Sequence, residues 1–212
     1  MKMSTMRMKV WSLTAACFFA SLTVDAQINM RYVLSQMPDT LAPYLSKNDR
    51  LDLADFVDSG MKAEVANTLE GKTVLNVLSA DYAKLTLNDA ATIEMRLLPL
   101  TLDQDTGSNA VDTTYQTLCV VRTYGNNLRE SVINFYTPLW TPLPVSNKIE
   151  IGEEWGTVDD DFGSYHVELG QHEPTLTLET NTQLDVPANE EQKKAEKKSI
   201  VLKWDGRRFK KH

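Results

Sequence analysis

The chain has 212 residues, of which 22 are Lys or Arg and 29 are Asp or Glu, so its formal net charge at pH 7 is -7. A net acidic chain argues against nucleic-acid binding by the protein as a whole, because the nucleic-acid backbone is also negative. The length is sufficient for one domain with its own hydrophobic core. With 3 histidines, histidine-based acid–base catalysis has few candidate residues.

The N-terminus has the pattern of a secretory signal peptide. Its first residues are basic with no acid among them, and an apolar run of roughly 15 residues follows, which is too short for a comfortable membrane span. Val24 and Ala26 stand where signal peptidase requires small residues. We therefore expect residues 1–26 to be removed and the chain to be exported, to the periplasm or out of the cell. We expect no membrane span in the mature chain.

The two cysteines carry different expectations. The segment "LTAAC" ends at Cys17 and resembles a lipoprotein box, so a lipid anchor at Cys17 is the alternative to cleavage after Ala26. However, the stretch after Cys17 is apolar, where a lipoprotein has a polar tether. The mature chain keeps only Cys119, which excludes an internal disulfide. Cys119 lies in a strand-like run, and we expect it to be a small buried hydrophobe.

Two helices are predicted in the N-terminal third. Apolar residues recur at helical spacing over 30–37, and Pro38 ends that helix. The clearer helix lies over 46–61, where Ser46 or Asn48 can cap the N-terminus and nearby aspartates suit the positive end of the helix dipole. The face that we expect to be buried consists of Leu51, Ala54, Val57 and Met61, widened by Leu53 and Phe56.

After these helices the apolar residues alternate with polar ones, which is the period of a β-strand. Ile93, Met95 and Leu97 form one side of such a strand. Glu94 and Arg96 belong to the other side, which we expect to face solvent. Strand–helix–strand alternation is missing from the pattern, so the sheet is expected to be antiparallel. The strands predicted here are 72–78, 82–87, 92–100, 115–124 and 131–137.

The last third of the sequence is less regular. Strands are predicted at 164–170 and 174–184, and a hairpin over 199–209 with Asp205-Gly206 at the centre of a type I′ turn. The charged segment 189–199 is expected to be a mobile loop. Basic residues are concentrated at this end of the chain, which is either a solvated charged tail or a surface for an acidic partner, an anionic lipid or the acidic body of the protein itself.

Together these elements predict an α+β fold, with the N-terminal helices packed on one face of an antiparallel β-sheet of about six to nine strands. We expect a single domain over 27–212. The side chains expected to be buried are Leu51, Val57, Leu85, Ile93, Met95, Val121, Ile133 and Trp204.

The segment "VDDDFGSYHVELGQHEP" contains the best candidates for metal ligands. The spacing at 159–163 resembles a fragment of a calcium loop, but the position of the closing glutamate is Gly170. His166, Glu168 and His172 would be the ligands of an open zinc site. Against this, His166 and Glu168 alternate with apolar residues, as on the solvent face of a strand. We therefore predict a solvated acidic turn at 159–161, then a strand, with no metal and no cofactor.

The segment "INFYTPLWTPLPV" places three aromatic side chains among prolines. Phe135, Tyr136 and Trp140 are a candidate surface for a ligand or partner, because exposed aromatics stack on sugars or prolines. The alternative is a strand end whose aromatics cover the core. Catalytic residues are not assigned, since the sequence has no strong catalytic motif. A non-enzymatic binding or accessory protein is therefore the first hypothesis, and a carboxylate-dependent hydrolase acting on glycans or peptides is the alternative.

The segments "LSQMPDTLAPYLSKNDRLDLADFVDSGMKAEVANTLEGK", "ADYAKLTLNDAATIEMRLLPL" and "FYTPLW" resemble a family of small exported Bacteroidales proteins of unknown function. The resemblance covers roughly residues 30–145 well and the remainder loosely. It implies a signal peptide, a helix pair and then a sheet in one domain. It brings no catalytic or binding residues, so the expected partner stays an unidentified envelope protein, peptide or glycan.

Overall fold

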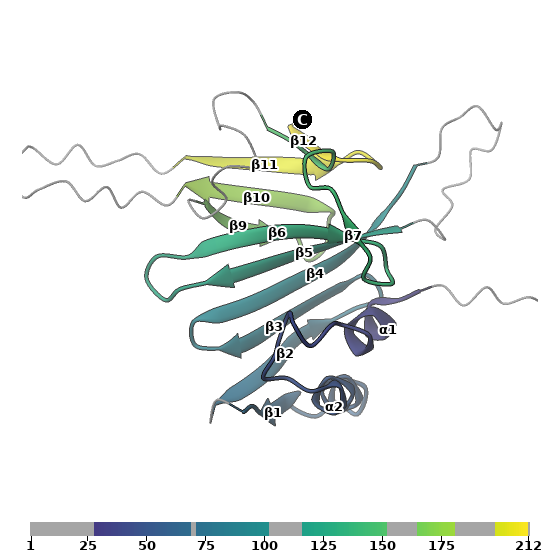
Figure 1. Cartoon of the computed structure of the whole chain (residues 1–212), viewed down its shortest axis with the longest axis vertical. Coiled ribbons are helices and arrows are strands. Elements are labelled where there is room, and N and C mark those ends of the chain that lie inside the picture. Colours follow the sequence, from purple (N-terminus) through teal and green to yellow (C-terminus); the bar gives the residue numbers. More distant parts are fainter. Residues whose placement is uncertain (1–27, 69–70, 102–115, 152–164, 181–197, 212) are drawn as a thin grey trace, which may run out of the picture.

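Two β-sheets and two short helices make up the part of the chain that the computed structural model describes, which is residues 28–68, 71–101, 116–151, 165–180 and 198–211 (Figure 1). The predicted signal peptide and the predicted acidic turn at 159–161 lie outside these residues. So does most of the predicted charged loop, although Lys198 and Ser199 at its end are described. Within the described residues, no helix is long and apolar enough to cross a membrane.

The first sheet is a meander, in which each strand pairs antiparallel with the next strand along the chain. Alternating sequences joined by tight turns favour this topology, because neighbouring strands can pair without a crossover. The predicted strands of this region are confirmed, with shifts at their ends. The strands are β1 (Glu64–Ala66), β2 (Lys72–Leu78), β3 (Tyr82–Asn88), β4 (Ala91–Pro99), β5 (Gln116–Tyr124), β6 (Glu130–Tyr136) and β7 (Pro142–Leu143).

The second sheet has the strand order β8-β12-β11-β10-β9, and only the β8–β12 pair among its described pairs is parallel. The predicted hairpin at its centre is confirmed, but its turn is not of type I′. Asp205 N donates to Arg208 O, and of the two residues between them only Gly206 has a positive φ, as in a type II′ turn. The strands are β8 (Ile149–Glu150), β9 (Tyr165–Leu169), β10 (Thr175–Thr180), β11 (Ser199–Trp204) and β12 (Phe209–Lys211).

The two predicted helices are present as α1 (Met30–Ser35) and α2 (Lys47–Asp58). Ser46 caps α2 as predicted. Its side chain accepts a hydrogen bond from Asp49 N, and the Asp49 side chain accepts one from Ser46 N, which completes a capping box.

The predicted buried face of α2 is partly wrong. Leu51 is 38% exposed and Met61 is 54% exposed, whereas Arg50 is 2% exposed. The buried stripe begins at Arg50 and continues through Leu53, Ala54 and the half-buried Val57. Arg50 can occupy this stripe because its guanidinium donates to Leu45 O at 2.7 Å and to Asp39 Oδ1 at 3.0 Å.

The expected α+β fold, with helices on one face of a single sheet, is wrong. The protein is mostly β, because the C-terminal strands do not extend the first sheet but form a second sheet that covers its other face. The helices are short, with 6 and 12 residues. Of the side chains expected to be buried, Leu85, Ile93 and Met95 lie in the core beneath the helices, Val121 and Ile133 lie between the sheets, and Val57 and Trp204 are half-buried.

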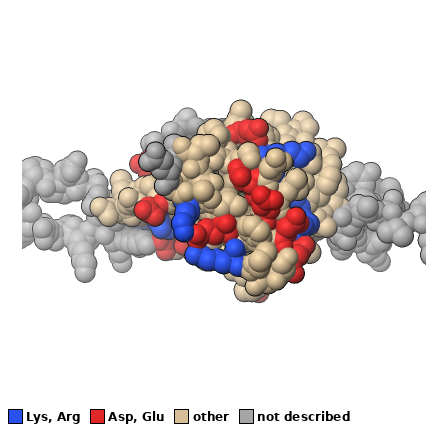
Figure 2. Space-filling model, turned by 90° about the horizontal axis from the view of Figure 1, so that it is seen from below, with Lys and Arg blue, Asp and Glu red and all other residues tan. Residues whose placement is uncertain are grey.

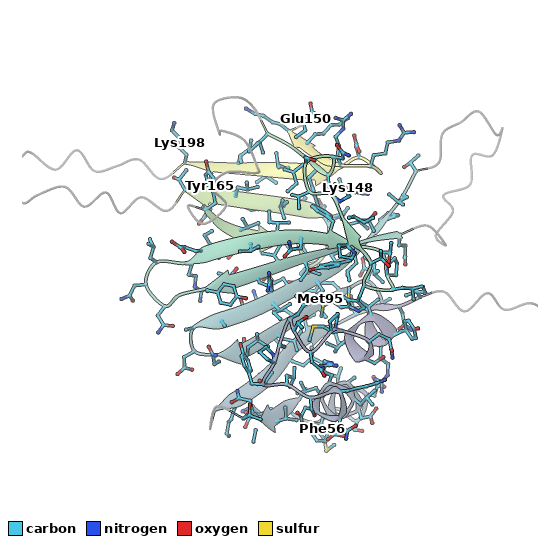
Figure 3. All side chains as sticks on the ribbon, in the orientation of Figure 1. Phe56, Met95, Lys148, Glu150, Tyr165 and Lys198 are labelled. Atoms are coloured by element: carbon cyan, nitrogen blue, oxygen red, sulfur yellow. The ribbon has the colours of Figure 1, made fainter. Side chains whose placement is uncertain are left out.

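The second sheet also changes the environment of β4. Glu94 and Arg96, which were expected to face solvent, are 5% and 4% exposed. They lie on the face of the first sheet that packs against the second sheet, whereas Met95 between them lies on the helix side (Figure 3). Both faces of this strand are therefore covered, and the polar face is covered by a second layer of strands.

Candidate functional site

A cleft of about 260 Å³ opens where β9 crosses the first sheet. β9 packs across β4, β5 and β6. The next strand of the first sheet, β3, lies beside β9 and contributes to the floor of the cleft. We call this site the β3–β9 cleft. Its lining comes from β3 and β4 of the first sheet and from β9, β10 and the turn between them, and consists of Tyr82, Lys84, Glu94, Glu168, Leu169, Gly170, Gln171 and Thr177.

Side chains of the first sheet hold the backbone of β9 along the wall of the cleft. Leu169 N donates to Glu94 Oε2 at 2.8 Å, and Val167 N donates to Ser131 Oγ at 2.9 Å. β9 is an edge strand of the second sheet, and its outer N–H groups would otherwise be open to pairing with another chain. Glu94 and Ser131 thus take the place of a neighbouring strand.

Glu94 is the centre of a polar network in the floor of the cleft. Its Oε1 lies 2.6 Å from Lys84 Nζ, while its Oε2 accepts the hydrogen bond from Leu169 N. Tyr82 is 2% exposed and faces the same carboxylate. Burial, followed by the charge of Glu94, raises the pKa of Tyr82 far above its usual value, so its hydroxyl stays protonated. The floor is therefore a set of mutually bonded groups with fixed positions.

Arg96 fixes the turn between β9 and β10. It donates through Nη1 to Gly170 O at 2.6 Å, and through Nη2 to Asp81 Oδ2 at 2.8 Å and to His172 O at 3.5 Å. The turn itself requires glycine, because a Cβ at Gly170 would lie 2.5 Å from the carbonyl oxygen of Glu173. Arg96 of the first sheet therefore fixes the turn of the second sheet that forms the rim of the cleft.

The predicted strand over 164–170 is confirmed. Val167 and Leu169 are buried between the sheets, while Glu168 projects outward with a side chain that is 62% exposed. His166 does not share this exposure, although the sequence predicted both on the solvent face: its side chain is 15% exposed, and its Nε2 lies 3.3 Å from Glu168 Oε1. His172 is exposed on the following turn, where its backbone oxygen accepts from Arg96. Among the described residues, no group of three His, Cys, Asp or Glu is placed to hold a metal ion.

The structure does not bring the three predicted aromatic residues to one exposed surface. Phe135 is 1% exposed and lies between the sheets, with its ring centroid 6.3 Å from that of Phe209. Tyr136 and Trp140 lie on the helix side, and Trp140 Nε1 donates to Val33 O at 3.0 Å. In this turn the most exposed large apolar side chain is Leu139. The placement matches the alternative interpretation, in which these aromatics cover the core.

Cys119 is fully buried between the sheets, as expected of a small hydrophobe. Burial, followed by the charge of Glu94, raises the pKa of the Cys119 thiol far above its usual value. The thiolate, which is the nucleophilic form, is therefore not populated at neutral pH.

The lining of the cleft was missed by sequence reasoning. A charged residue in a strand of alternating polarity normally faces water, so the alternation predicts that Lys84 and Glu94 are exposed to solvent. Their one sequence-level signal is complementary charge, because they are direct cross-strand partners in the β3–β4 hairpin. The position of β9 over this hairpin comes from tertiary packing, for which the sequence carries no local pattern.

Comparison with known proteins places the chain in a family. Residues 21–209 match the family described as "Protein of unknown function (DUF3256)". The fold is similar to the solved "Structure of a domain of an uncharacterized protein from Porphyromonas gingivalis W83", with a TM-score of 0.63, 18% sequence identity, and coverage of 86% of this chain and 96% of that chain. No curated protein matches the chain. The resemblance to a Bacteroidales family of unknown function is confirmed, and the chain belongs to the DUF3256 family.

Proposed function

We propose that this protein is an exported, non-enzymatic binding protein of the bacterial envelope, and that its ligand occupies the β3–β9 cleft. The observation that carries the proposal is the fixed polar floor of the cleft, in which Tyr82, Lys84 and Glu94 are held by one another. A preorganised polar surface in a concave site fixes the orientation of a ligand at little cost in conformational entropy.

The lining of the cleft favours a ligand rich in hydroxyl or amide groups, as in a glycan or a peptide. Lys84 and Gln171 offer donors, Glu168 offers acceptors, and Thr177 offers a hydroxyl group that serves as either. These groups come from different strands of both sheets. A sugar or peptide unit in the cleft would therefore contact several of them at once.

The test is a binding screen of the full mature chain against arrays of envelope glycans and peptides, followed by titration calorimetry of each hit. Glu168→Gln should weaken a true cleft ligand by roughly tenfold, since a charge-assisted hydrogen bond is lost. Glu173→Gln is the matched control, because Glu173 lies on the β9–β10 turn but does not itself line the cleft. Equal affinities of the two variants for every hit would refute the cleft as the binding site.

Export is part of the proposal and is supported by the signal pattern of residues 1–26. N-terminal sequencing of the protein from its native host should give Gln27 as the first residue. The alternative, a lipid anchor at Cys17, predicts incorporation of labelled fatty acid and loss of that label in Cys17→Ser. Recovery of the chain with Met1 intact would contradict both forms of export.

The alternative function, a carboxylate-dependent hydrolase, is kept because two glutamates, Glu94 and Glu168, line the same cleft. It is the weaker proposal, since both Glu94 oxygens already have partners and neither is left to act on a substrate. The cleft is also not lined by the turn around Trp140. Release of reducing sugars or peptides from envelope polymers, abolished in Glu168→Gln, would establish the hydrolase instead.

A further inference from the structure

The C-terminal hairpin has the strongest charge imbalance in the described part of the chain. Residues 198–211 contain six basic residues and one acidic residue, Asp205, although the whole protein has a net charge of -7. We call these six residues the basic strip. They are Lys198, Lys203, Arg207, Arg208, Lys210 and Lys211, all exposed except Lys210, which is partly exposed.

Charges at the opposite end of the molecule are arranged differently. Around α2 and β1, acidic and basic side chains are interspersed (Figure 2). Arg31 pairs with Asp55 and Asp58, and Glu64 pairs with both Lys62 and Lys72. Positive charge is therefore neutralised locally at this end, whereas it accumulates at the hairpin.

The basic strip includes a pairing that works against folding. Lys203 and Lys210 are direct cross-strand partners, so their side chains project from the same face of the sheet. Like charges in this position destabilise a sheet. Lys210 is partly compensated by Asp205 at 3.0 Å, and Arg208 by Glu150 at 2.9 Å. A sheet that keeps two like charges in directly paired positions breaks a local folding rule, and such places are often functional.

The basic residues lie at both ends of β11. Lys198 lies just before this strand, and the Arg207–Arg208 turn lies beyond its other end. The six residues of β11 extend over roughly 20 Å. Hydroxyl side chains stand beside the charges, since Thr175 is the cross-strand partner of Lys203. The surface thus offers a cluster of cations at the turn end of the hairpin, with a hydroxyl group beside it.

We propose that the basic strip binds an acidic polysaccharide, with the carboxylate groups of a polyuronate chain lying against the Lys203–Lys210 pair and the Arg207–Arg208 turn. Repeated carboxylates match clustered cations, and sugar hydroxyls match the Thr175 side chain beside Lys203. A lipid surface fits less well, because interfacial binding needs apolar side chains that insert. Val201 is the only large apolar side chain exposed among residues 198–211. Trp204 is held in place, since its Nε1 donates to Pro99 O at 2.6 Å.

The experiment measures binding of polygalacturonate to the full mature chain by titration calorimetry, at low salt and at physiological salt. Affinity should fall as salt rises, because the contact is between exposed charges. The double variant Lys203→Gln/Lys210→Gln should bind roughly tenfold more weakly. Its thermal stability should be equal to or higher than that of the parent, since the like-charge pair is gone, so lost binding cannot be attributed to unfolding.

The matched control is Lys62→Gln/Lys72→Gln, which changes the net charge equally at the opposite end of the molecule. It should retain the affinity of the parent within about twofold, because exposed charges this far apart are screened. The inference is independent of the β3–β9 cleft, because none of the six residues of the basic strip lines that cleft. Loss of affinity in the control equal to that in the hairpin variant would show that only net charge matters.

Three further probes separate the polysaccharide from other ligands. Neutral dextran should not bind. Vesicles of phosphatidylcholine with phosphatidylglycerol, and polyglutamate, should bind more weakly than polygalacturonate at equal charge concentration. If the vesicles or polyglutamate bind as tightly and lose affinity equally in Lys203→Gln/Lys210→Gln, the partner is a membrane surface or an acidic polypeptide, and the proposed polysaccharide is wrong.

Discussion

The two faces of the first sheet are covered in different ways. On the helix side, Leu85, Ile93 and Met95 pack against α1, α2 and the segment between them, and the contact is almost wholly apolar. On the other side, the second sheet is attached in part through Glu94, Arg96 and Ser131, which bond to the backbone of β9 and its turn. Apolar contact tolerates small shifts, whereas directed hydrogen bonds specify one position. The polar face therefore determines where β9 lies and how the cleft is shaped.

The largest expected effect tests the polar face. Arg96→Ala should lower the free energy of unfolding by about 4 kcal/mol, because it removes a buried guanidinium that donates to Asp81 and to the backbone of the β9–β10 turn. Urea denaturation measures this. Arg122→Ala is a matched control, since Arg122 is half-buried and its guanidinium donates to Asn134 alone among the residues that the structure describes. If the two variants were equally stable, hydrogen bonds would not be what holds the second sheet.

The next variant tests the apolar face of the same strand. Met95→Ala should cost about 3 kcal/mol through lost burial and the cavity that it leaves. Met95→Leu should cost under about 1.5 kcal/mol, because it keeps most of the volume. Hydrogen exchange sharpens the comparison. In Met95→Ala the amides of Val167 and Leu169 should open only with global unfolding, whereas in Arg96→Ala they should open earlier. Early opening in both variants would mean that the two faces are not independent.

A smaller effect is expected at the middle of β9. Ser131→Ala removes the acceptor for Val167 N and should cost roughly 1 kcal/mol. Exchange of the Val167 amide should accelerate while that of Leu169, bonded to Glu94, stays slow. Ser199→Ala, on an exposed position of β11, serves as the control and should change neither rate. If the exchange of both amides accelerated equally, β9 would separate from the first sheet as a unit, and the two hydrogen bonds would not act independently.

The smallest effect concerns the helix that covers the apolar face. Leu51→Ala should change stability by less than about 0.5 kcal/mol, because Leu51 is 38% exposed. Leu53→Ala, two positions along α2, should cost about 3 kcal/mol, because Leu53 is fully buried. Thermal melts of the two variants measure this difference in stability. A larger loss from Leu51→Ala would mean that the helix presents the face predicted from its apolar residues alone.

The elements that the sequence predicted well are those with a strong local signal. Ser46 and Asp49 form a capping box that predicts the start of α2. The alternation of apolar and polar residues predicts β2 to β6. Arg50 shows where this reasoning fails. Its place in the buried stripe depends on Asp39 and on the carbonyl of Leu45, which a count of apolar residues cannot include. The rotation of α2 was mispredicted for that reason.

The candidate site was the least predictable part, and the cause is the second sheet. Glu94 has the alternation of a solvent-facing residue, and it becomes buried only because β9, distant in sequence, packs over it. The aromatic residues at 135–140 were predicted as a candidate exposed surface, but both faces of the strand that carries Phe135 and Tyr136 are covered. Phe135 is buried between the sheets, and Tyr136 packs on the helix side. Which faces are covered is a property of tertiary structure, and periodicity alone does not contain it.

The meander of the first sheet has a consequence for the order of folding. Its strands pair with their neighbours in sequence, so most of its contacts are local, whereas the second sheet joins Ile149 to Phe209 in a long-range parallel pair. Local contacts form faster, because less loop-closure entropy is lost before they are made. We expect the first sheet to form early and to present Glu94 and Ser131 as a ready template for β9. Pulse-labelling hydrogen exchange should then protect β3 to β5 before β9 and β11. The reverse order would mean that the second sheet nucleates the fold.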